Sequence, residues 1–248
     1  TSPHLKDFRE RIRINGKMIS EQEVLEFVNE NYEFIENLEP SFFEVTVAMA
    51  FHHFAVNEVD IAIIEVGLGG RLDSTNVILP ELSLISNIAF DHMNILGNTL
   101  PLIAGEKAGI IKKGVPVIIS QKQDEVTDVF IKKAAEQQSK IIFASEEWLI
   151  KKSNVQQNSP EFLKVDINQK INAIPPYFSF PTIELDLTGT YQLKNLGGVL
   201  STVKQLRELG YQISDQNISE ALRQVKALTG LMGRWQMLQE APLVICDT

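Results

Sequence analysis

The chain has 248 residues, which suffices for one large domain or for one domain with an appendage. Its formal net charge of −9 argues against a general nucleic-acid-binding protein, and it has no apolar run long enough to span a membrane. The single cysteine, Cys246, excludes an internal disulfide and favours a reducing compartment, so we expect a cytoplasmic protein without nucleic-acid or membrane partners.

The first part of the chain is predicted to be mainly helical. Ser20 is a typical helix N-cap, and Glu23 three residues later completes a capping box, so a helix should run from there towards Leu38. A second helix should follow Pro40. Its core-facing residues at helical spacing are Val47, Ala50, Phe51 and Phe54.

A basic segment precedes these helices. Arg11 and Arg13 alternate with apolar residues, which is typical of an extended edge with both guanidinium groups on one side. Such a pair suits a carboxylate or phosphate ligand, but a charged, solvated strand explains the same residues equally well.

The segment from Asp60 to Asn76 combines an apolar run with a polar turn. Ile61 to Ile64 is predicted to be a strand buried on both faces, and Glu65 and a glycine-rich turn follow it. Ligands of parallel α/β sheets collect at the carboxyl ends of strands, which makes this a candidate site; an ordinary tight turn with a solvated glutamate is the alternative. The glycines do not form G-x-G-x-x-G, which argues against a nicotinamide dehydrogenase.

Strands and helices alternate through the middle of the chain. The expected buried strands are Leu82–Ala89, Val115–Ile119 and Ile141–Ala144, and the helices between them are Leu102–Lys112 and Val126–Gln138. This alternation predicts βαβ units, and therefore an α/β fold with a mostly parallel sheet flanked by helices.

The last third of the chain is predicted to change character. Between Glu146 and Pro181 we expect a small antiparallel edge region, and at Leu185–Tyr191 a short strand and turn. Two helices should follow, at Leu196–Leu209 and Ile218–Leu228.

Three polar residues are expected to form a site at the carboxyl edge of the parallel sheet. Glu65 ends one predicted strand and His92 ends the next, so the two should lie side by side. A carboxylate, an imidazole and a hydroxyl can hold Mg²⁺ together with waters, although a satisfied core or N-cap histidine is the alternative for His92. Lys107 lies among small apolar residues on a helix face expected to be buried, and burial favours a neutral amine, which can react with carbon dioxide to form a carbamate.

Several long motifs in order resemble the folylpolyglutamate synthase family, including its bifunctional form that is also a dihydrofolate synthase, within the Mur-ligase superfamily. They cover essentially the whole chain: TSPHLKDFRERIRING (1–16), SFFEVTVAMAFHHF (41–54), EVGLGGRLDSTN (65–76), FDHMNILGNTL (90–100), IAGEKAGIIKKGVPV (103–117), MGRW (232–235) and the closing CDT. The resemblance implies the P-loop-like fold of a Mur-ligase central domain.

The resemblance also implies roles for single residues. The positions that match magnesium ligands are Ser2, Glu65, His92 and Lys107, the last as a carbamylated lysine, so that catalytic roles fall to His92 and Lys107. The positions that match ATP contacts are Asn195, Arg234 and Asp247. Phe42 and Phe43 fall in the segment that lines the pterin pocket, where a flat ring would stack on an aromatic face. Two positions depart from the family: Tyr191 replaces the usual histidine, and Met232 the usual proline.

The sequence contains no G-x-x-x-x-G-K-[ST] phosphate loop. In the family that loop lies just before TSPH, and a second domain that binds the amino-acid substrate follows the position of Asp247. We therefore expect a piece of a longer protein, with residues 1–241 in the ATP-binding central domain and residues 242–248 at the start of the C-terminal domain. This piece alone should be inactive.

By resemblance, the whole protein is an ATP-dependent ligase that adds L-glutamate to dihydropteroate or to a folate through an acyl phosphate, releasing ADP. It would use ATP and two magnesium ions and act as a monomer on small-molecule substrates. One alternative is a Mur ligase acting on peptidoglycan precursors, against which the SPH and RIRING segments argue. The other is a non-catalytic binding module, because this chain lacks the lysine that grips the phosphates.

Overall fold

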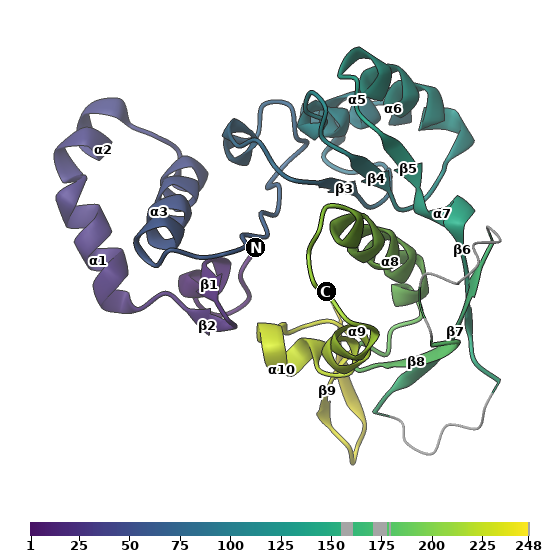
Figure 1. Cartoon of the computed structure of the whole chain (residues 1–248). Coiled ribbons are helices and arrows are strands. Elements are labelled where there is room, and N and C mark those ends of the chain that lie inside the picture. The colour runs from purple at the N-terminus through teal and green to yellow at the C-terminus, as the bar shows by residue number, and fades with distance from the viewer. Residues whose placement is uncertain (155–160, 171–177, 179, 248) are drawn as a thin grey trace. The chain divides into compact units, whose positions relative to one another are not determined.

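The computed structural model describes residues 1–154, 161–170, 178 and 180–247. The chain divides into two compact units, Thr1–Ile78 and Leu79–Thr248, each with its own hydrophobic core (Figure 1). The units are described one at a time below. No helix among the described residues has the length and apolar content needed to cross a membrane.

Unit 1 is mainly helical. Its helical elements are η1 (Phe8–Arg11), α1 (Glu21–Glu30), α2 (Tyr32–Leu38), α3 (Phe42–Val56) and η2 (Ser74–Val77). A hairpin joins β1 (Arg13–Ile14) to β2 (Lys17–Met18). Its turn residues Asn15 and Gly16 both have positive φ, 50° and 78°, which is the backbone twist that two-residue hairpin turns favour.

The helix starts of unit 1 confirm the predicted caps. The Ser20 hydroxyl accepts the Glu23 N–H at 3.2 Å, and the Glu23 carboxylate accepts the Ser20 N–H at 2.9 Å. Ser41 and Glu44 form the same box at the start of α3. The single helix predicted to reach Leu38 is wrong, because it ends at Asn31, whose side chain donates to the carbonyl oxygen of Phe27 at 2.8 Å.

The strand predicted at Ile61–Ile64 is also wrong. Ile61 is 63% exposed and Ile63 is 92% exposed, so the run is not buried. Residues 61–64 have no strand structure, and no strand in the described part of the chain pairs with them. Apolar β-branched residues form a strand only where a neighbouring strand supplies the hydrogen-bonded ladder.

Unit 2 contains the predicted parallel sheet. Its strands β3 (Ser83–Ile85), β4 (Val117–Ile119) and β5 (Ile141–Phe143) pair in that order, all parallel. The intervening helices are α4 (Met93–Leu96), α5 (Leu100–Lys107), η3 (Ala108–Ile110) and α6 (Asp124–Glu136). β4 is buried throughout, as the central strand should be. β3 is shorter than predicted and not buried on both faces, since Leu84 is 42% exposed.

The predicted antiparallel strands between Glu146 and Pro181 are confirmed, as a sheet of their own. After α7 (Ala144–Glu147), β6 (Trp148–Lys152), β7 (Leu163–Gln169) and β8 (Thr182–Leu185) pair in the order β6-β7-β8. The strand predicted to start at Leu185 is wrong, because β8 ends there. The fold class, an α/β fold with a parallel sheet and an antiparallel region, is confirmed.

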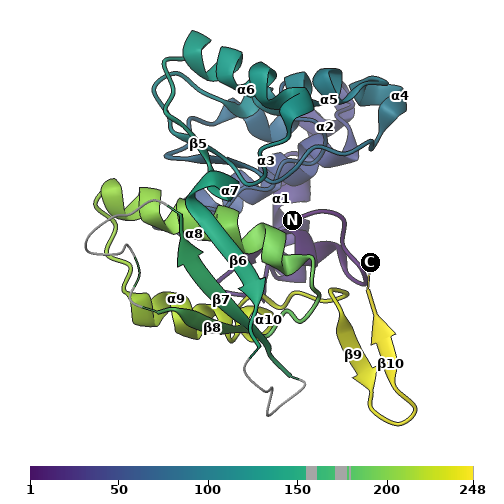
Figure 2. The same cartoon turned by 90° about the vertical axis from the view of Figure 1, so that its right-hand side faces the viewer.

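The remaining elements are helices and a hairpin. α8 (Gln192–Glu208), α9 (Asp215–Leu222) and α10 (Val225–Thr229) are followed by β9 (Gln236–Gln239) and β10 (Val244–Cys246). The single helix predicted at Ile218–Leu228 is therefore two helices. The β9–β10 hairpin projects away from the antiparallel sheet of unit 2 (Figure 2).

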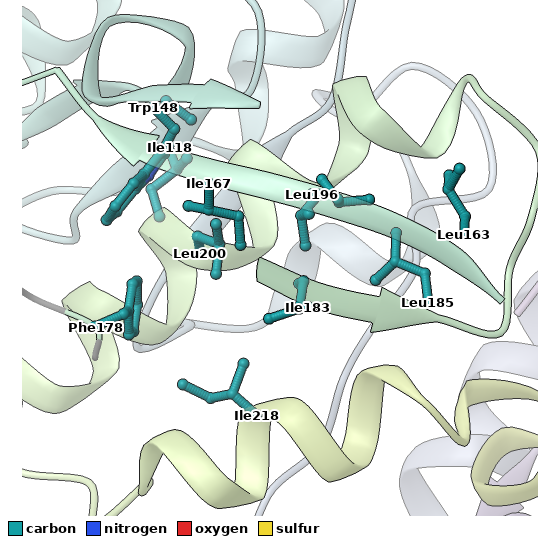
Figure 3. Close-up of a cluster of buried hydrophobic side chains, with 12 residues drawn as sticks. Ile118, Trp148, Leu163, Ile167, Phe178, Ile183, Leu185, Leu196, Leu200 and Ile218 are labelled. Atoms are coloured by element: carbon teal, nitrogen blue, oxygen red, sulfur yellow. The ribbon is translucent and has the colours of Figure 1, made fainter. Parts of the chain in front are cut away.

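Helix α8 packs against both sheets of unit 2 (Figure 1). Its residues Leu196 and Leu200 belong to a core that joins Ile118 of β4 to the inner face of the antiparallel sheet (Figure 3). Gly198 allows this close packing, because a Cβ there would lie 2.1 Å from the Ser120 hydroxyl oxygen. At Gly197 an added Cβ would make an ordinary contact, 3.6 Å from the Ile150 side chain.

A buried polar network also ties α8 to the antiparallel sheet. The Glu147 carboxylate accepts hydrogen bonds from the Ser201 hydroxyl at 2.6 Å and from the Lys204 ammonium. The Trp148 ring N–H donates to the Ser201 hydroxyl at 2.8 Å. The charged side chains are only 10% (Glu147) and 13% (Lys204) exposed, so this ion pair is largely removed from water.

Candidate functional site

Ser2 and Glu65 lie together in unit 1, although 63 residues separate them in the sequence. The Ser2 N–H donates to the Glu65 carboxylate at 2.8 Å. Two of the residues matched to magnesium ligands are therefore neighbours. A carboxylate beside a hydroxyl-bearing residue is a donor set of hard oxygens, which suits Mg²⁺.

The loop that carries Ser2 is held by a second carboxylate, that of Glu10. Glu10 accepts the backbone N–H groups of Leu5, Lys6 and Asp7 at 2.9, 3.0 and 2.8 Å. These hydrogen bonds, that from Leu5 most of all, favour the ionised form and hold the pKa of Glu10 below its ordinary value. The carboxylate of Glu10 thus fixes the segment just after Ser2.

A cavity of about 120 Å³ in unit 1 is lined by both Ser2 and Glu65. Arg11 and Arg13 line it too, although Arg11 belongs to a 3-10 helix and not to the predicted extended edge. The helix face predicted to face the core also borders this cavity, through Val47, Ala50, Phe51 and Phe54.

The glycine-rich turn is organised by Asp73. Its carboxylate accepts the Leu68 N–H at 2.8 Å and the Thr75 N–H at 3.0 Å, which closes the turn and caps η2. An open hollow of about 530 Å³ lies between this turn and α3. Three members of the polar set that follows the glycines line it: Arg71, Asp73 and Asn76.

Phe42 and Phe43 point to different surroundings. Phe42 is 60% exposed, with the Arg11 guanidinium 5.5 Å from its ring centre. Phe43 lines the 120 Å³ cavity and packs against Gly67, where an added Cβ would lie 2.3 Å from the ring. Gly67 thus allows the turn to approach α3.

His92 and Lys107 belong to unit 2. His92 precedes α4 with a left-handed backbone (φ 47°, ψ 40°), its side chain is 56% exposed, and its Nε2 lies 3.6 Å from a carboxylate oxygen of Asp91. The alternative of a core histidine is therefore wrong, whereas that of an N-cap histidine holds for its position: His92 is the N-cap residue of α4, although its side chain makes no capping hydrogen bond. Lys107 ends α5 and is only partly buried, so the expected burial of its helix face is wrong at this residue.

Glu65 and His92 lie in different units, so their predicted contact stays a prediction. Among the described residues, no group of three or more His, Cys, Asp or Glu side chains is gathered as a metal site. The magnesium ligands that the resemblance implies are of another kind, because two of the four are a serine and a lysine.

Asp247, one of the residues matched to ATP contacts, binds two other groups of unit 2. Its carboxylate accepts the Tyr191 hydroxyl at 3.0 Å and the Trp235 N–H, next to Arg234, at 2.9 Å. Asn195 lies in the first turn of α8, and its side chain donates to Gln192 at 3.0 Å. We call Tyr191, Arg234 and Asp247 the Asp247 cluster.

Tyr191 stands where the related motif has histidine, and the sequence did not indicate its hydrogen bond to Asp247. Burial, and then the hydrogen bond to Asp247, raise the pKa of Tyr191 above its ordinary value. Its hydroxyl therefore remains protonated and donates to Asp247. Its place beside Asn195, where the related motif has histidine, was the available signal.

Comparison with known proteins agrees with this geometry. The family described as Mur ligase middle domain matches residues 19–203. The dihydrofolate synthase/folylpolyglutamate synthase of Bacillus subtilis (strain 168) is 37% identical over 262 residues, a match that covers 100% of this chain and 56% of that protein. The chain thus spans little more than half the length of this curated relative.

Solved structures give the same result. Folylpolyglutamate synthase from Thermotoga maritima is 33% identical with a TM-score of 0.80, and the match covers 100% of this chain and 55% of that one. An FPGS–AMPPCP–folate complex is 27% identical with a TM-score of 0.84, and the match covers 100% of this chain and 59% of that one. Sequence and structure agree over a contiguous match of most of the chain, and the chain belongs to the Mur ligase middle domain family.

Proposed function

We propose that this chain is the ATP-binding part of a ligase that adds L-glutamate to dihydropteroate or to a folate. The observation that supports this best is that folding brings together two residues that the resemblance had matched to one task, since the Ser2 N–H donates to the Glu65 carboxylate in unit 1. In unit 2 the ATP-matched Asp247 accepts the Tyr191 hydroxyl and the Trp235 N–H, next to Arg234 in the sequence.

The reaction has two steps. A carboxylate oxygen of the acceptor attacks the γ-phosphorus of ATP, giving an acyl phosphate and ADP. The amine of glutamate then attacks the acyl carbon, expelling phosphate and losing a proton, to form the amide. No residue of the chain need act as a covalent nucleophile, because positioning and electrostatic stabilisation carry most phosphoryl transfers.

We assign the metal-binding role to Ser2, Glu65, His92 and Lys107. Magnesium bound there would offset the negative charges that approach each other when a carboxylate attacks a phosphate. Lys107 as a carbamate would offer an oxygen ligand, which an ammonium group cannot do. Its partial exposure leaves the amine accessible to carbon dioxide.

We assign ATP contacts to Asn195, Arg234 and Asp247, with Tyr191 holding Asp247 in place. Arg234 carries a fixed positive charge suited to phosphate oxygens. By donating a hydrogen bond to the Asp247 carboxylate, the Tyr191 hydroxyl restricts the rotation of that side chain. The match to an FPGS–AMPPCP–folate complex over the whole chain supports nucleotide binding by this fold.

The sizes of the two hollows in unit 1 favour different ligands. Sites for drug-sized molecules measure roughly 300–1,000 Å³. The cavity beside Ser2 and Glu65, about 120 Å³, is too small for a pterin but suits an ion with its waters. The hollow of about 530 Å³ between α3 and the glycine-rich turn is large enough for the acceptor, and Phe51 lines it. The pterin contacts proposed for Phe42 and Phe43 lie outside this lining, since Phe43 lines the smaller cavity.

We further propose that residues 1–241 belong to the central domain and residues 242–248 begin a C-terminal, glutamate-binding domain. The whole enzyme would work as a monomer in the cytoplasm on small molecules, without nucleic-acid or membrane partners. Alone, the 248-residue chain should show negligible ligase turnover.

The deciding experiment measures ADP release by the full-length protein with glutamate and either dihydropteroate or tetrahydrofolate. We expect turnover on at least one acceptor, its loss in Lys107→Ala, and partial rescue of that variant by short carboxylic acids that replace the carbamate. Lys113→Ala, a nearby lysine with no assigned role, is the matched control.

Two results would contradict the proposal. Glutamate-independent turnover with a uridine-nucleotide acceptor would favour a Mur ligase acting on peptidoglycan precursors. Nucleotide binding without ADP release on any acceptor would favour the non-catalytic binding module. Full activity of Lys107→Ala would remove the carbamate but leave the ligase assignment intact.

A further inference from the structure

The side chain of Gln123 is bound to the backbone of a distant residue. Its carbonyl oxygen accepts the Ile88 N–H at 2.8 Å, and its amide group donates to the Ile88 carbonyl oxygen, also at 2.8 Å. One side chain thus satisfies both polar groups of a residue 35 positions earlier. Because Ile88 is only 3% exposed, water could not replace these bonds readily.

Gln123 occupies an unusual place for such a contact. It is the N-cap residue of α6, where Ser, Thr, Asp or Asn normally binds the first N–H groups of the helix. Its side chain makes no capping bond, although its extended backbone (φ −124°, ψ 116°) is suitable for a cap. The Gln123 side chain therefore binds the backbone of Ile88 and does not cap α6.

The contact extends the parallel sheet beyond its last backbone pair. β3 ends at Ile85 and β4 ends at Ile119, and the Ser120 N–H still donates to the Ile85 carbonyl oxygen at 2.9 Å. Beyond Ile85 and Ser120 the two segments are no longer paired as strands. The primary amide of Gln123 offers one donor and one acceptor, as a backbone peptide does, and so continues the pairing to Ile88.

The held residue leads directly to His92. The residues from Ala89 to His92 are all exposed, so the protein core does not fix their course. Beyond them the His92 carbonyl oxygen accepts the N–H groups of Ile95 and Leu96 at 2.9 Å each, and Leu96 is buried. Residues 89–92 are therefore held at two ends only: by the hydrogen bonds of Gln123 to Ile88 at the start, and by the first turn of α4 at the end.

His92 itself has a constrained backbone. A left-handed conformation at a residue with a side chain costs about 1 kcal/mol and persists only where surrounding contacts impose it. The bonds to Ile88 and the first turn of α4 are such contacts.

We propose that Gln123 is a positioning residue for His92: its amide fixes the Ile88 peptide and thereby orients the exposed segment that ends in the imidazole. This inference rests on the proposed function, in which His92 is a magnesium ligand. Gln123 touches neither substrate nor metal. It acts on the reaction only through the backbone of residues 88–92.

Gln123→Asn is the most informative variant. Asparagine keeps the amide but is one methylene shorter, so it cannot reach both polar groups of Ile88. It is also a preferred N-cap residue, so α6 should be as stable as before or more so. The variant therefore separates loss of positioning from loss of folding, and Gln123→Leu, which removes both bonds, is the second variant.

Thr127→Val is the matched control. The Thr127 hydroxyl donates to the Gln123 backbone carbonyl at 2.8 Å, and Thr127 is buried in the same first turn of α6. Its replacement perturbs that turn but leaves the Gln123 side chain on Ile88. Effects shared by all three variants would reflect the stability of α6 and nothing more.

Two readouts in the full-length protein test the inference. The first is the histidine ring spectrum by NMR, with the His92 resonance assigned from His92→Gln, together with amide exchange at Ile88. The second is the magnesium concentration that gives half-maximal ADP release. We expect Gln123→Asn and Gln123→Leu to shift the His92 resonance, to speed exchange at Ile88, and to raise the magnesium requirement about 10-fold, in the range seen for residues that orient metal ligands.

In the same variants the KM for acceptor and for glutamate should stay near the wild-type value, and Thr127→Val should change neither readout. An unchanged His92 resonance in both Gln123 variants would overturn the inference, as would a magnesium requirement that rises equally in Thr127→Val. If the wild-type protein releases no ADP, the proposed function fails, and the His92 resonance and Ile88 exchange still decide whether Gln123 orients the segment.

Discussion

The buried ion pair between Glu147 and Lys204 provides the sharpest test of the energetics of unit 2. Replacing Glu147 with leucine removes the carboxylate that the Lys204 ammonium, 13% exposed, contacts. Breaking one side of a buried pair costs about 3–5 kcal/mol, because the remaining charge stays desolvated after it has lost that partner. We therefore expect Glu147→Leu to lower the free energy of unfolding by that amount.

The double variant should behave differently. In Glu147→Leu/Lys204→Met both charges of the pair are removed, and Trp148 can still donate to Ser201. Replacing a whole buried pair by apolar residues is often neutral or stabilising. The free energy of unfolding of the double variant should therefore be about 3 kcal/mol or more higher than the value expected from adding the effects of the two single substitutions. The neighbouring pair Lys122–Glu146 is the control, since its side chains are 36% and 55% exposed and Glu146→Leu should change stability by about 1 kcal/mol or less.

Urea unfolding of the 248-residue chain measures these differences. The chain has two tryptophans, so a Trp235→Phe background leaves the fluorescence of Trp148, which lies in the network itself. A Glu147→Leu cost no larger than that of Glu146→Leu, or strict additivity in the double variant, would refute the reasoning that burial makes this pair costly to break.

Three further predictions use other features. Gly198→Ala should destabilise the chain by about 1–3 kcal/mol through overpacking. Gly105→Ala, with no atom within 4 Å of the new Cβ, should instead stabilise α5 by up to about 1 kcal/mol. Urea unfolding of the two variants measures both changes, and equal effects would contradict the close packing of α8. Tyr191→Phe should raise the KM for ATP of the full-length protein about 2- to 10-fold, the value of one hydrogen bond, and an unchanged KM would remove Tyr191 from the cluster. Because the pKa of Tyr191 is raised in the folded chain, the bond should contribute at all pH values below the ordinary tyrosine range and be lost as pH rises through the raised pKa, which tyrosinate absorbance can follow. The hydrogen bond from Arg9 lowers the pKa of Asp7 to about 2, so its contribution to stability should be present above the ordinary aspartate range and lost as pH falls through about 2; carboxyl NMR should find this value and a return towards the ordinary one in Arg9→Ala.

The predictions that succeeded from sequence alone concern local interactions. A capping box joins residues three positions apart, so Ser20 with Glu23 could be recognised without knowing the fold. The parallel sheet was predictable because each strand and each helix between strands carries its own apolar pattern.

The failed strand prediction at Ile61–Ile64 concerns non-local pairing. Ile61 and Ile63 have the composition of a buried strand, but a strand also needs a partner, and composition does not supply one. The same limit applies to the site. Ser2 and Glu65 were linked by resemblance, whereas the Tyr191–Asp247 and Gln123–Ile88 hydrogen bonds depend on side-chain reach across the fold and left no pattern in the sequence.

The absence of a side chain at Gly198 has a consequence for how substitutions spread through unit 2. At this residue α8 lies directly against Ser120 and Leu84 of the parallel layer, because a Cβ there would lie 2.1 and 3.3 Å from their side chains. A volume change in that layer should then shift the helix, because close-packed interiors transmit strain. The first turn of α8 carries Asn195 and follows Tyr191, so core substitutions in the parallel sheet should alter the proposed nucleotide affinity before they unfold the chain.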